Sequence, residues 1–139
     1  MMWIDKIKYA CAVAGALAGG FLGGSDGFLY AVTVFVVLDY ITGVMAAVAG
    51  KMLSSKVGFS GLLRKVMIFA LIGVGHIIDS FVTGGYAGEA GIFRTAIICF
   101  YLANEGVSIL ENAAAMGLPV PESLRGALAQ LREKGDKGQ

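Results

Sequence analysis

Charged residues are scarce in this sequence. Aspartate, glutamate, lysine and arginine make up 15% of its 139 residues, whereas an ordinary soluble domain carries roughly a quarter. Hydrophobic residues make up 57%, which leaves too few polar positions for helices that must each turn one side towards water. The formal net charge of +1 offers no overall attraction to nucleic acid. The composition therefore predicts a membrane protein without a nucleic-acid partner.

Cysteine and histidine are also rare, which excludes several kinds of site. Cys11 and Cys99 both lie within apolar runs, so we expect free, buried thiols rather than a disulfide. The single histidine, His76, is followed three residues later by Asp79. A metal or acid-base site needs a second histidine or a nucleophile at a matching depth, and the sequence offers neither. We therefore expect no enzyme activity, no metal and no cofactor.

Long apolar runs are abundant. A helix needs about 20 apolar residues to cross a bilayer, and residues 27–50, 62–83 and 91–115 meet this length. A fourth run, residues 9–24, is short and consists mostly of alanine and glycine, so it is a span, a half-inserted helix or a signal peptide. Because the next run follows almost at once, cleavage would leave a chain that begins inside the membrane, and we expect the segment to be retained.

These runs predict an all-α membrane protein. Its transmembrane domain covers residues 1–117, with three strong transmembrane helices and a short glycine-rich N-terminal span or half-span. Lysine and arginine gather on the cytoplasmic side of membrane proteins, and here they gather between residues 51 and 65. The connections at 25–27 and 84–90 each carry one acidic residue. With four spans, both termini are therefore expected in the cytoplasm.

The tail, residues 118–139, differs in composition from the rest. Pro119 and Pro121 end the last apolar helix, because proline lacks a backbone donor and disfavours helix before it. Leu124, Leu128 and Leu131 then recur at helical spacing, with charged residues on the other faces. This pattern predicts a short amphipathic helix in the cytoplasm that rests on membrane lipids, with a partner site as the alternative.

Small residues recur every four positions in the N-terminal run. Lipid tails give helices no hydrophobic reason to associate, so small residues that allow close approach mark helix contacts. The predicted packing positions are Gly15, Gly19, Gly20, Gly23 and Gly24. Two small faces on one helix indicate more than one neighbour, in the same chain or in other copies; a weak, flexible segment is the alternative.

Polar residues interrupt the apolar runs at costly depths. Asp39 and Glu105 lie about halfway along their spans, where an ionised side chain costs about 2.5 to 3.5 kcal/mol. His76 and Asp79 share one helix face nearer the outer surface. The last span also carries a polar stripe, made of Asn104, Glu105, Ser108, Glu111 and Asn112. We interpret all of these as pore-lining residues or polar contacts between copies.

Two explanations of these residues compete. In the first they are satisfied within the chain, through ion pairs of Asp79 with Arg94 and of Glu111 with Arg64 or Lys65. Asp39 and Glu105 have no cation at their depth in this interpretation, so they are protonated, hydrogen-bonded to groups such as Thr42 or Asn104, or in contact with water. In the second, which we favour, neighbouring copies hide the stripe at rest, and it lines an aqueous path after assembly.

Specific segments resemble a known family. LDYITGVMAAVAGKMLSSKVGFSGLLRK, HIIDSF and RTAIICFYLANEGVSILENAAAMGLPVPESL are similar to the phage-lysis and toxin-secretion holin family, over about residues 38–131. The resemblance implies a homo-oligomer in the bacterial cytoplasmic membrane of the host. It opens a lesion that lets a cell-wall hydrolase, the endolysin, act without direct contact, or it exports a toxin. The positions highlighted are Asp39, Gly43, Arg94, Asn104, Glu105, Ser108, Glu111 and Asn112, with Gly43 as a packing position.

Two other functions remain open from the sequence. A small ion or proton channel or transporter would use Asp39, His76 and Glu105 as its path. A membrane anchor would hold a soluble partner through the tail.

Overall fold

The computed structural model describes residues 2–82 and 91–137, and this part of the chain folds into five helices. They are α1 (Met2–Phe21), α2 (Gly27–Ala49), α3 (Ser55–Val82), α4 (Ile92–Ala115) and α5 (Glu122–Lys137). No strand occurs in these described ranges, which confirms the all-α prediction. Three helices, α2, α3 and α4, are long and apolar enough to cross a membrane. The predicted outer connection at 84–90 lies outside the described residues.

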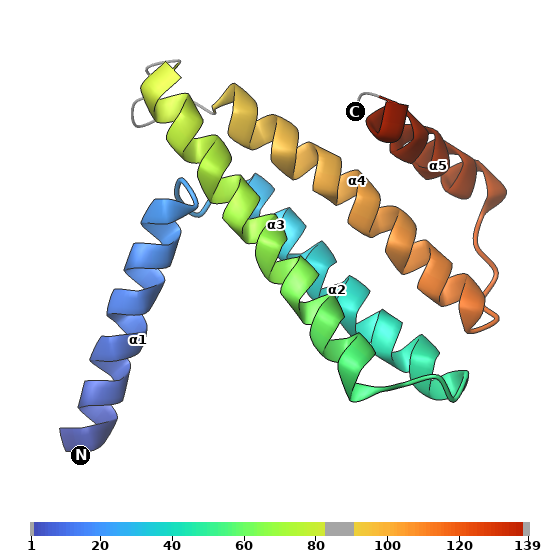
Figure 1. The fold of residues 1–139 in the computed structure, drawn as a ribbon, viewed down its shortest axis with the longest axis horizontal. Coiled ribbons are helices and arrows are strands. Elements are labelled where there is room, and N and C mark those ends of the chain that lie inside the picture. Colours follow the sequence, from blue (N-terminus) through green and yellow to red (C-terminus); the bar gives the residue numbers. More distant parts are fainter. Residues whose placement is uncertain (1, 83–90, 138–139) are drawn as a thin grey trace.

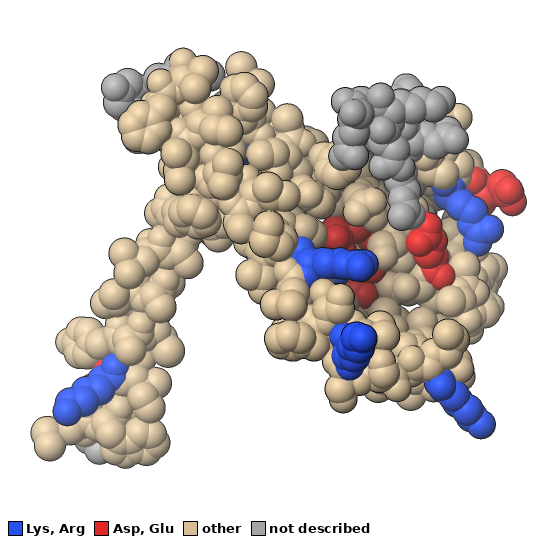
Figure 2. All heavy atoms as spheres, in the orientation of Figure 1, with Lys and Arg blue, Asp and Glu red and all other residues tan. Residues whose placement is uncertain are grey.

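The three spanning helices form one bundle, in which α4 packs against both α2 and α3 (Figure 1). Its buried core is aliphatic: Leu29, Val32 and Val36 from α2, Ile68 and Ile72 from α3, and Ile98 from α4. Many large apolar side chains instead point outwards, and Figure 2 shows charged groups at only a few places on the face it draws. An apolar surface of this extent fits hydrocarbon as the surrounding medium.

The two ends of the bundle differ. Ala49, Ser55 and Ala115 lie at one end, beside Lys51 and Lys56, and we call it the basic end (Figure 1). The opposite end contains the start of α2, the end of α3 and the start of α4, and we call it the Arg94 end. These names locate the polar groups along the bundle.

Helix α1 leaves the bundle at the Arg94 end and diverges from it (Figure 1). It meets α3 near its own C-terminus, where the ring of Phe21 occupies the space in which a Cβ at Gly73 would lie. Its apolar part, residues 9–21, extends only about 20 Å, less than the hydrocarbon thickness of about 30 Å. No other group in the described residues lies near Gly15, Gly19 or Gly20. These three positions of the predicted glycine seam are therefore uncovered within this part of the chain, whereas Gly23 packs against Arg94 and His76. Cys11 and Cys99 are free, as predicted, but both are exposed on the surface of the single chain rather than buried.

Helix α3 begins earlier than hydropathy predicts, at Ser55 rather than at residue 62. The Ser54 hydroxyl accepts a hydrogen bond from the Val57 amide at 3.2 Å, which satisfies one of the unpaired donors at the helix start. The charged residues after it have good helix propensity, so the helix continues through them although they are not apolar. Arg64 and Lys65 therefore lie well inside α3.

Helix α5 folds back against α4 (Figure 1). The reversal begins at Gly117, which ends α4 in the left-handed conformation with φ 86°. Pro119 and Pro121 follow it. The amphipathic tail helix is thus present.

Candidate functional site

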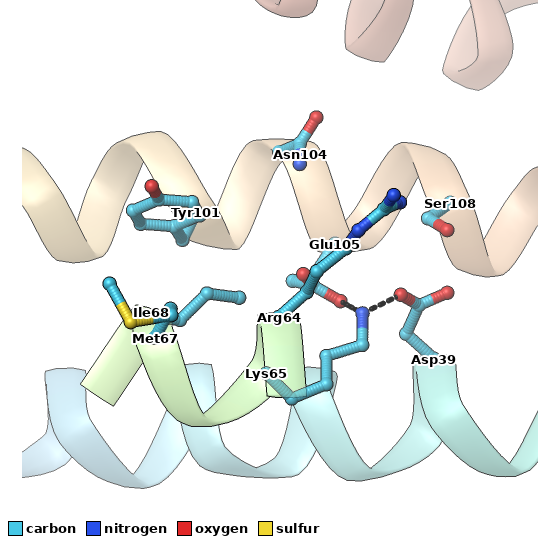
Figure 3. Close-up of a pocket in the computed structure, with 9 residues that line it drawn as sticks. All are labelled: Asp39, Arg64, Lys65, Met67, Ile68, Tyr101, Asn104, Glu105 and Ser108. Carbon is cyan, nitrogen blue, oxygen red and sulfur yellow. Dashed lines mark hydrogen bonds and ion pairs between the residues drawn. The ribbon is translucent and has the colours of Figure 1, made fainter. Parts of the chain in front are cut away.

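Lys65 bridges two carboxylates between the three spanning helices. Its Nζ donates to Oε2 of Glu105 at 2.6 Å and also pairs with Oδ2 of Asp39 (Figure 3). The carboxylate side chains are only 4% and 8% exposed, and the lysine side chain 17%. The expectation that Asp39 and Glu105 lack a cation at their depth is therefore wrong.

The depth of these groups explains why they need one another. Asp39, Lys65 and Glu105 each lie about 15 Å along their helices from the basic end. An ion at that depth in a bilayer needs a partner. Because two carboxylates share one ammonium, the cluster carries a formal charge of −1 when both carboxylates are ionised. We call these three side chains the Lys65 network.

Asn112 extends this network to α2. Its Nδ2 donates to Oδ1 of Asp39 at 3.0 Å, to the Asp39 carbonyl at 3.2 Å and to Oγ1 of Thr42 at 3.0 Å. A Cβ at Gly43 would lie 3.6 Å from the same nitrogen, so Gly43 is part of this contact. Asp39 thus has two side-chain partners, from α3 and α4.

Replacing Asn112 with leucine should lower the free energy of unfolding by about 1 kcal/mol, the usual worth of a polar contact between membrane helices. The loss is modest because Lys65 still neutralises Asp39. Unfolding in mixed micelles with increasing dodecyl sulfate, followed by circular dichroism, measures it. Thr42→Val is the matched control and should cost less, because Asn112 then keeps both bonds to Asp39. A loss as large as that from a missing charge partner would contradict this ranking.

A hollow of about 410 Å³ opens beside the Lys65 network between α3 and α4. Asn104 and Ser108 of the predicted stripe line it from α4, and Arg64 lines it from α3 (Figure 3). Figure 2 shows acidic side chains at the bottom of this hollow, with basic side chains around it. The stripe is thus divided: Glu105 and Asn112 are bound within the chain, while Asn104 and Ser108 border open space. Glu111 is exposed further along α4.

Arg94 forms a second polar centre at the opposite end. It is 4% exposed, and its guanidinium binds Asp26 through Nη1 at 2.7 Å and Nη2 at 3.2 Å. Nε donates to the Leu22 carbonyl at 2.6 Å, and Nη2 donates to the Gly24 carbonyl at 3.0 Å. One side chain of α4 thus holds the whole turn between α1 and α2.

Asp79 binds the backbone of Arg94 and not its guanidinium, in contrast to the predicted ion pair. Its two carboxylate oxygens accept the backbone amides of Phe93 and Arg94, each at 2.9 Å. Asp79 therefore caps the start of α4, where Gly91 supplies no side chain. The guanidinium of Arg94 is directed to Asp26, so the predicted Asp79–Arg94 ion pair is replaced by this cap. Lys65, one of the two cations predicted to pair with Glu111, binds Asp39 and Glu105 instead.

Asp26 is a site residue that the sequence interpretation missed. Its Oδ1 also accepts the Leu29 amide at 2.9 Å and caps α2. The hydrogen bonds from Arg94 hold the pKa of the Asp26 carboxyl below its ordinary value. An aspartate immediately before an apolar run is a typical N-cap, and this position is the signal in the sequence that could have found it.

Glycine is required next to this centre. Gly23 has φ 88°, and a Cβ there would lie 2.7 Å from Nε of Arg94 and 2.8 Å from Nδ1 of His76. His76 therefore lies against the Arg94 centre rather than in a metal site. No cluster of three potential metal ligands occurs among the residues that the structure describes.

Comparison with known proteins identifies the family. A sequence model of the bacteriophage holin family matches residues 16–133. This chain belongs to the bacteriophage holin family. The probable holin of Bacillus phage phi105 is 31% identical to it, over 87% of this chain and 86% of the phage protein. An uncharacterized 14.9 kDa protein of Clostridium perfringens is 40% identical over 94% and 96% of the two chains.

Another uncharacterized protein, from Halalkalibacterium halodurans, is 40% identical to this holin over 96% of this chain and 97% of its own. No solved structure matches. The predicted family resemblance is thus confirmed, as is a membrane protein with transmembrane helices. The holin family is not an enzyme family.

Proposed function

We propose that this holin oligomerises in the bacterial cytoplasmic membrane and opens a lesion that lets a cell-wall hydrolase act, which times host lysis. Membership of the holin family supports this role. One structural observation carries it: the Lys65 network is buried at bilayer depth and borders a hollow that opens sideways from the bundle.

The Lys65 network is compatible with two environments, hydrocarbon around a single chain and water between assembled copies. In a single chain, Asp39, Lys65 and Glu105 satisfy one another, so the bundle tolerates hydrocarbon. Asn104 and Ser108, which line the hollow, are better covered by another copy than by lipid. Once many copies gather, water that enters between them hydrates the same charges, each of which would cost about 2.5 to 3.5 kcal/mol as an unpaired ion at mid-depth. Assembly thus favours a state in which water contacts the Lys65 network.

Expression in bacteria, with and without a cytoplasmic cell-wall hydrolase, tests the function. We expect abrupt loss of viability in both cultures and clearing of the culture only with the hydrolase. Asp39→Asn and Glu105→Gln should change the time of onset or the lesion size, because each alters the charge that must become wet. Glu122→Gln on α5 removes a carboxylate outside the bundle and should leave the timing unchanged. Unchanged timing and lesion size in both network variants would contradict the role of the network.

We also propose that both termini face the cytoplasm. Lys51 and Lys56 mark the basic end as cytoplasmic, and α4 ends there, before the tail. Lys6 and Lys8 lie about 22 and 20 Å along α1 from Phe21, and their long side chains extend further towards the same side. Protease access to terminal tags in oriented vesicles tests this arrangement.

A small cation channel is supported less well. His76 lies about 16 Å along α3 from Lys65, at the Arg94 end, so it does not continue a path from Asp39 and Glu105. Both carboxylates are also bound by an ammonium. Release of protein-sized cargo from liposomes would support a lesion, and release of ions alone would support a channel or a small-pore holin.

A further inference from the structure

Arg64 lies at the rim of the hollow and extends from α3 towards α4 (Figure 3). It is exposed, and within the described residues its guanidinium has no hydrogen bond and no ion pair. The hollow that it lines also includes Asn104 and Ser108, which lie about 16 and 10 Å from the basic end of α4. A permanently charged group at that depth in hydrocarbon requires a counter-charge.

An acidic residue, Glu111, lies on the neighbouring helix α4. Glu111 follows Ser108 by three residues, so it shares that face of α4, one turn nearer the basic end. It is exposed, although it also interacts within the single chain. Arg64 on α3 and Glu111 on α4 thus lie about 14 and 6 Å from the basic end, and Glu111 lies one turn beyond the part of α4 that lines the hollow.

This arrangement is self-complementary. Copies inserted in the same orientation are related by axes along the membrane normal, and a two-fold axis sets the same patch of each copy against the other. We propose that the hollow face between α3 and α4 is a docking surface for a second copy of this chain, in which Arg64 of each copy pairs with Glu111 of the other. The pairing neutralises both guanidinium groups and covers both hollows. It deepens the proposed function, which requires copies to associate, by naming the contact.

Helix α5 occupies part of this side in the single chain. Arg125 and Ala129 of α5 line a second hollow, of about 430 Å³, together with Glu111 of α4. Seven residues of α5 are charged. The helix is therefore more stable at the lipid surface than in hydrocarbon beside α4. Docking requires α5 to leave this side of α4, and it exchanges the interactions of Glu111 within the chain for Arg64 of the other copy.

Charge reversal in mixed chains tests the contact. Full-length chains with two different tags are expressed together, and dimers are measured by cross-linking in native membranes. Arg64→Glu alone and Glu111→Arg alone should each lower the dimer yield at least about tenfold, because both pairings of the two-fold contact are lost. Co-expression of the two variants should restore mixed dimers, because every contact between unlike chains then joins opposite charges. Lys56→Glu reverses a charge on α3 outside both hollows and should leave the yield unchanged.

Neutral variants separate a specific contact from simple repulsion between like charges. Arg64→Gln and Glu111→Gln introduce no new charge and should also lower the yield. Their mixture should recover only part of it, because each mixed dimer keeps one of the two Arg64–Glu111 pairings. Rescue by both reversals in one chain, without rescue in the mixture, would mean pairing within the chain and would overturn the proposal. Unchanged dimers in all single variants would overturn it also, with the proposed function intact. A wild-type chain that never dimerises would instead overturn the proposed function itself.

Discussion

Lys65→Met should destabilise this holin by about 3 to 5 kcal/mol, the usual result of removing one partner from a buried ion pair. The substitution keeps an unbranched side chain of similar length but leaves Asp39 and Glu105 without their cation. Unfolding in mixed micelles and the amount of protein in the membrane should both report the loss. An unchanged unfolding midpoint would show that the two carboxylates do not depend on Lys65.

Matched variants separate charge from packing. Lys56→Met removes a lysine outside the network and should have little effect. Glu105→Gln should also be mild, because a balanced pair of Asp39 and Lys65 remains. The triple variant Asp39→Asn, Lys65→Met, Glu105→Gln should recover most of the stability, since neutral groups of similar volume often replace a buried ion cluster without loss. A triple variant as unstable as Lys65→Met would indicate a packing role instead.

The predicted and missed parts of this network differ for a physical reason. Hydropathy located the spans, and helical periodicity placed Glu105 and Asn112 on one side of α4, because both signals are local. The partner of Asp39 and Glu105 was missed because the apolar run was taken to begin at residue 62, which left Lys65 near a loop. In the structure α3 begins at Ser55, and the long lysine stem carries its charge to the depth of the carboxylates.

The Arg94 centre shows the same limit. The sequence supplied Asp79 as the nearest acid at a suitable depth for Arg94, and Asp26 was treated only as an acidic residue in an outer connection. Two contacts that periodicity does not encode decide the outcome: the turn after α1 brings Asp26 over α4, and Asp79 binds the first amides of α4. Pairings across 68 residues of sequence depend on how helices cross.

Arg94→Lys should be nearly as damaging as complete removal of the side chain, although it preserves the charge. The guanidinium makes four separate bonds, to Leu22, Gly24 and twice to Asp26. A lysine ammonium is a point charge that does not reproduce this planar fork. We expect a loss of at least about 2 kcal/mol in unfolding free energy, given about 1.5 to 3 kcal/mol for each charged hydrogen bond. Arg94→Leu should cost about 3 to 5 kcal/mol.

Asp26, which accepts two of these hydrogen bonds, should contribute less to the free energy of unfolding than Arg94, and its contribution should depend on pH. Asp26→Asn keeps an oxygen for the Leu29 amide and removes only a charge that is 42% exposed. Because the pKa of Asp26 is lowered in the folded protein, its stabilising charge is complete above about pH 4 and is lost as the pH falls through the folded value. Wild-type protein should therefore lose more stability than Asp26→Asn as the pH falls from about 5 through the lowered pKa of Asp26. Equal losses in the two proteins would mean that Arg94 holds the turn through the carbonyls of Leu22 and Gly24 alone.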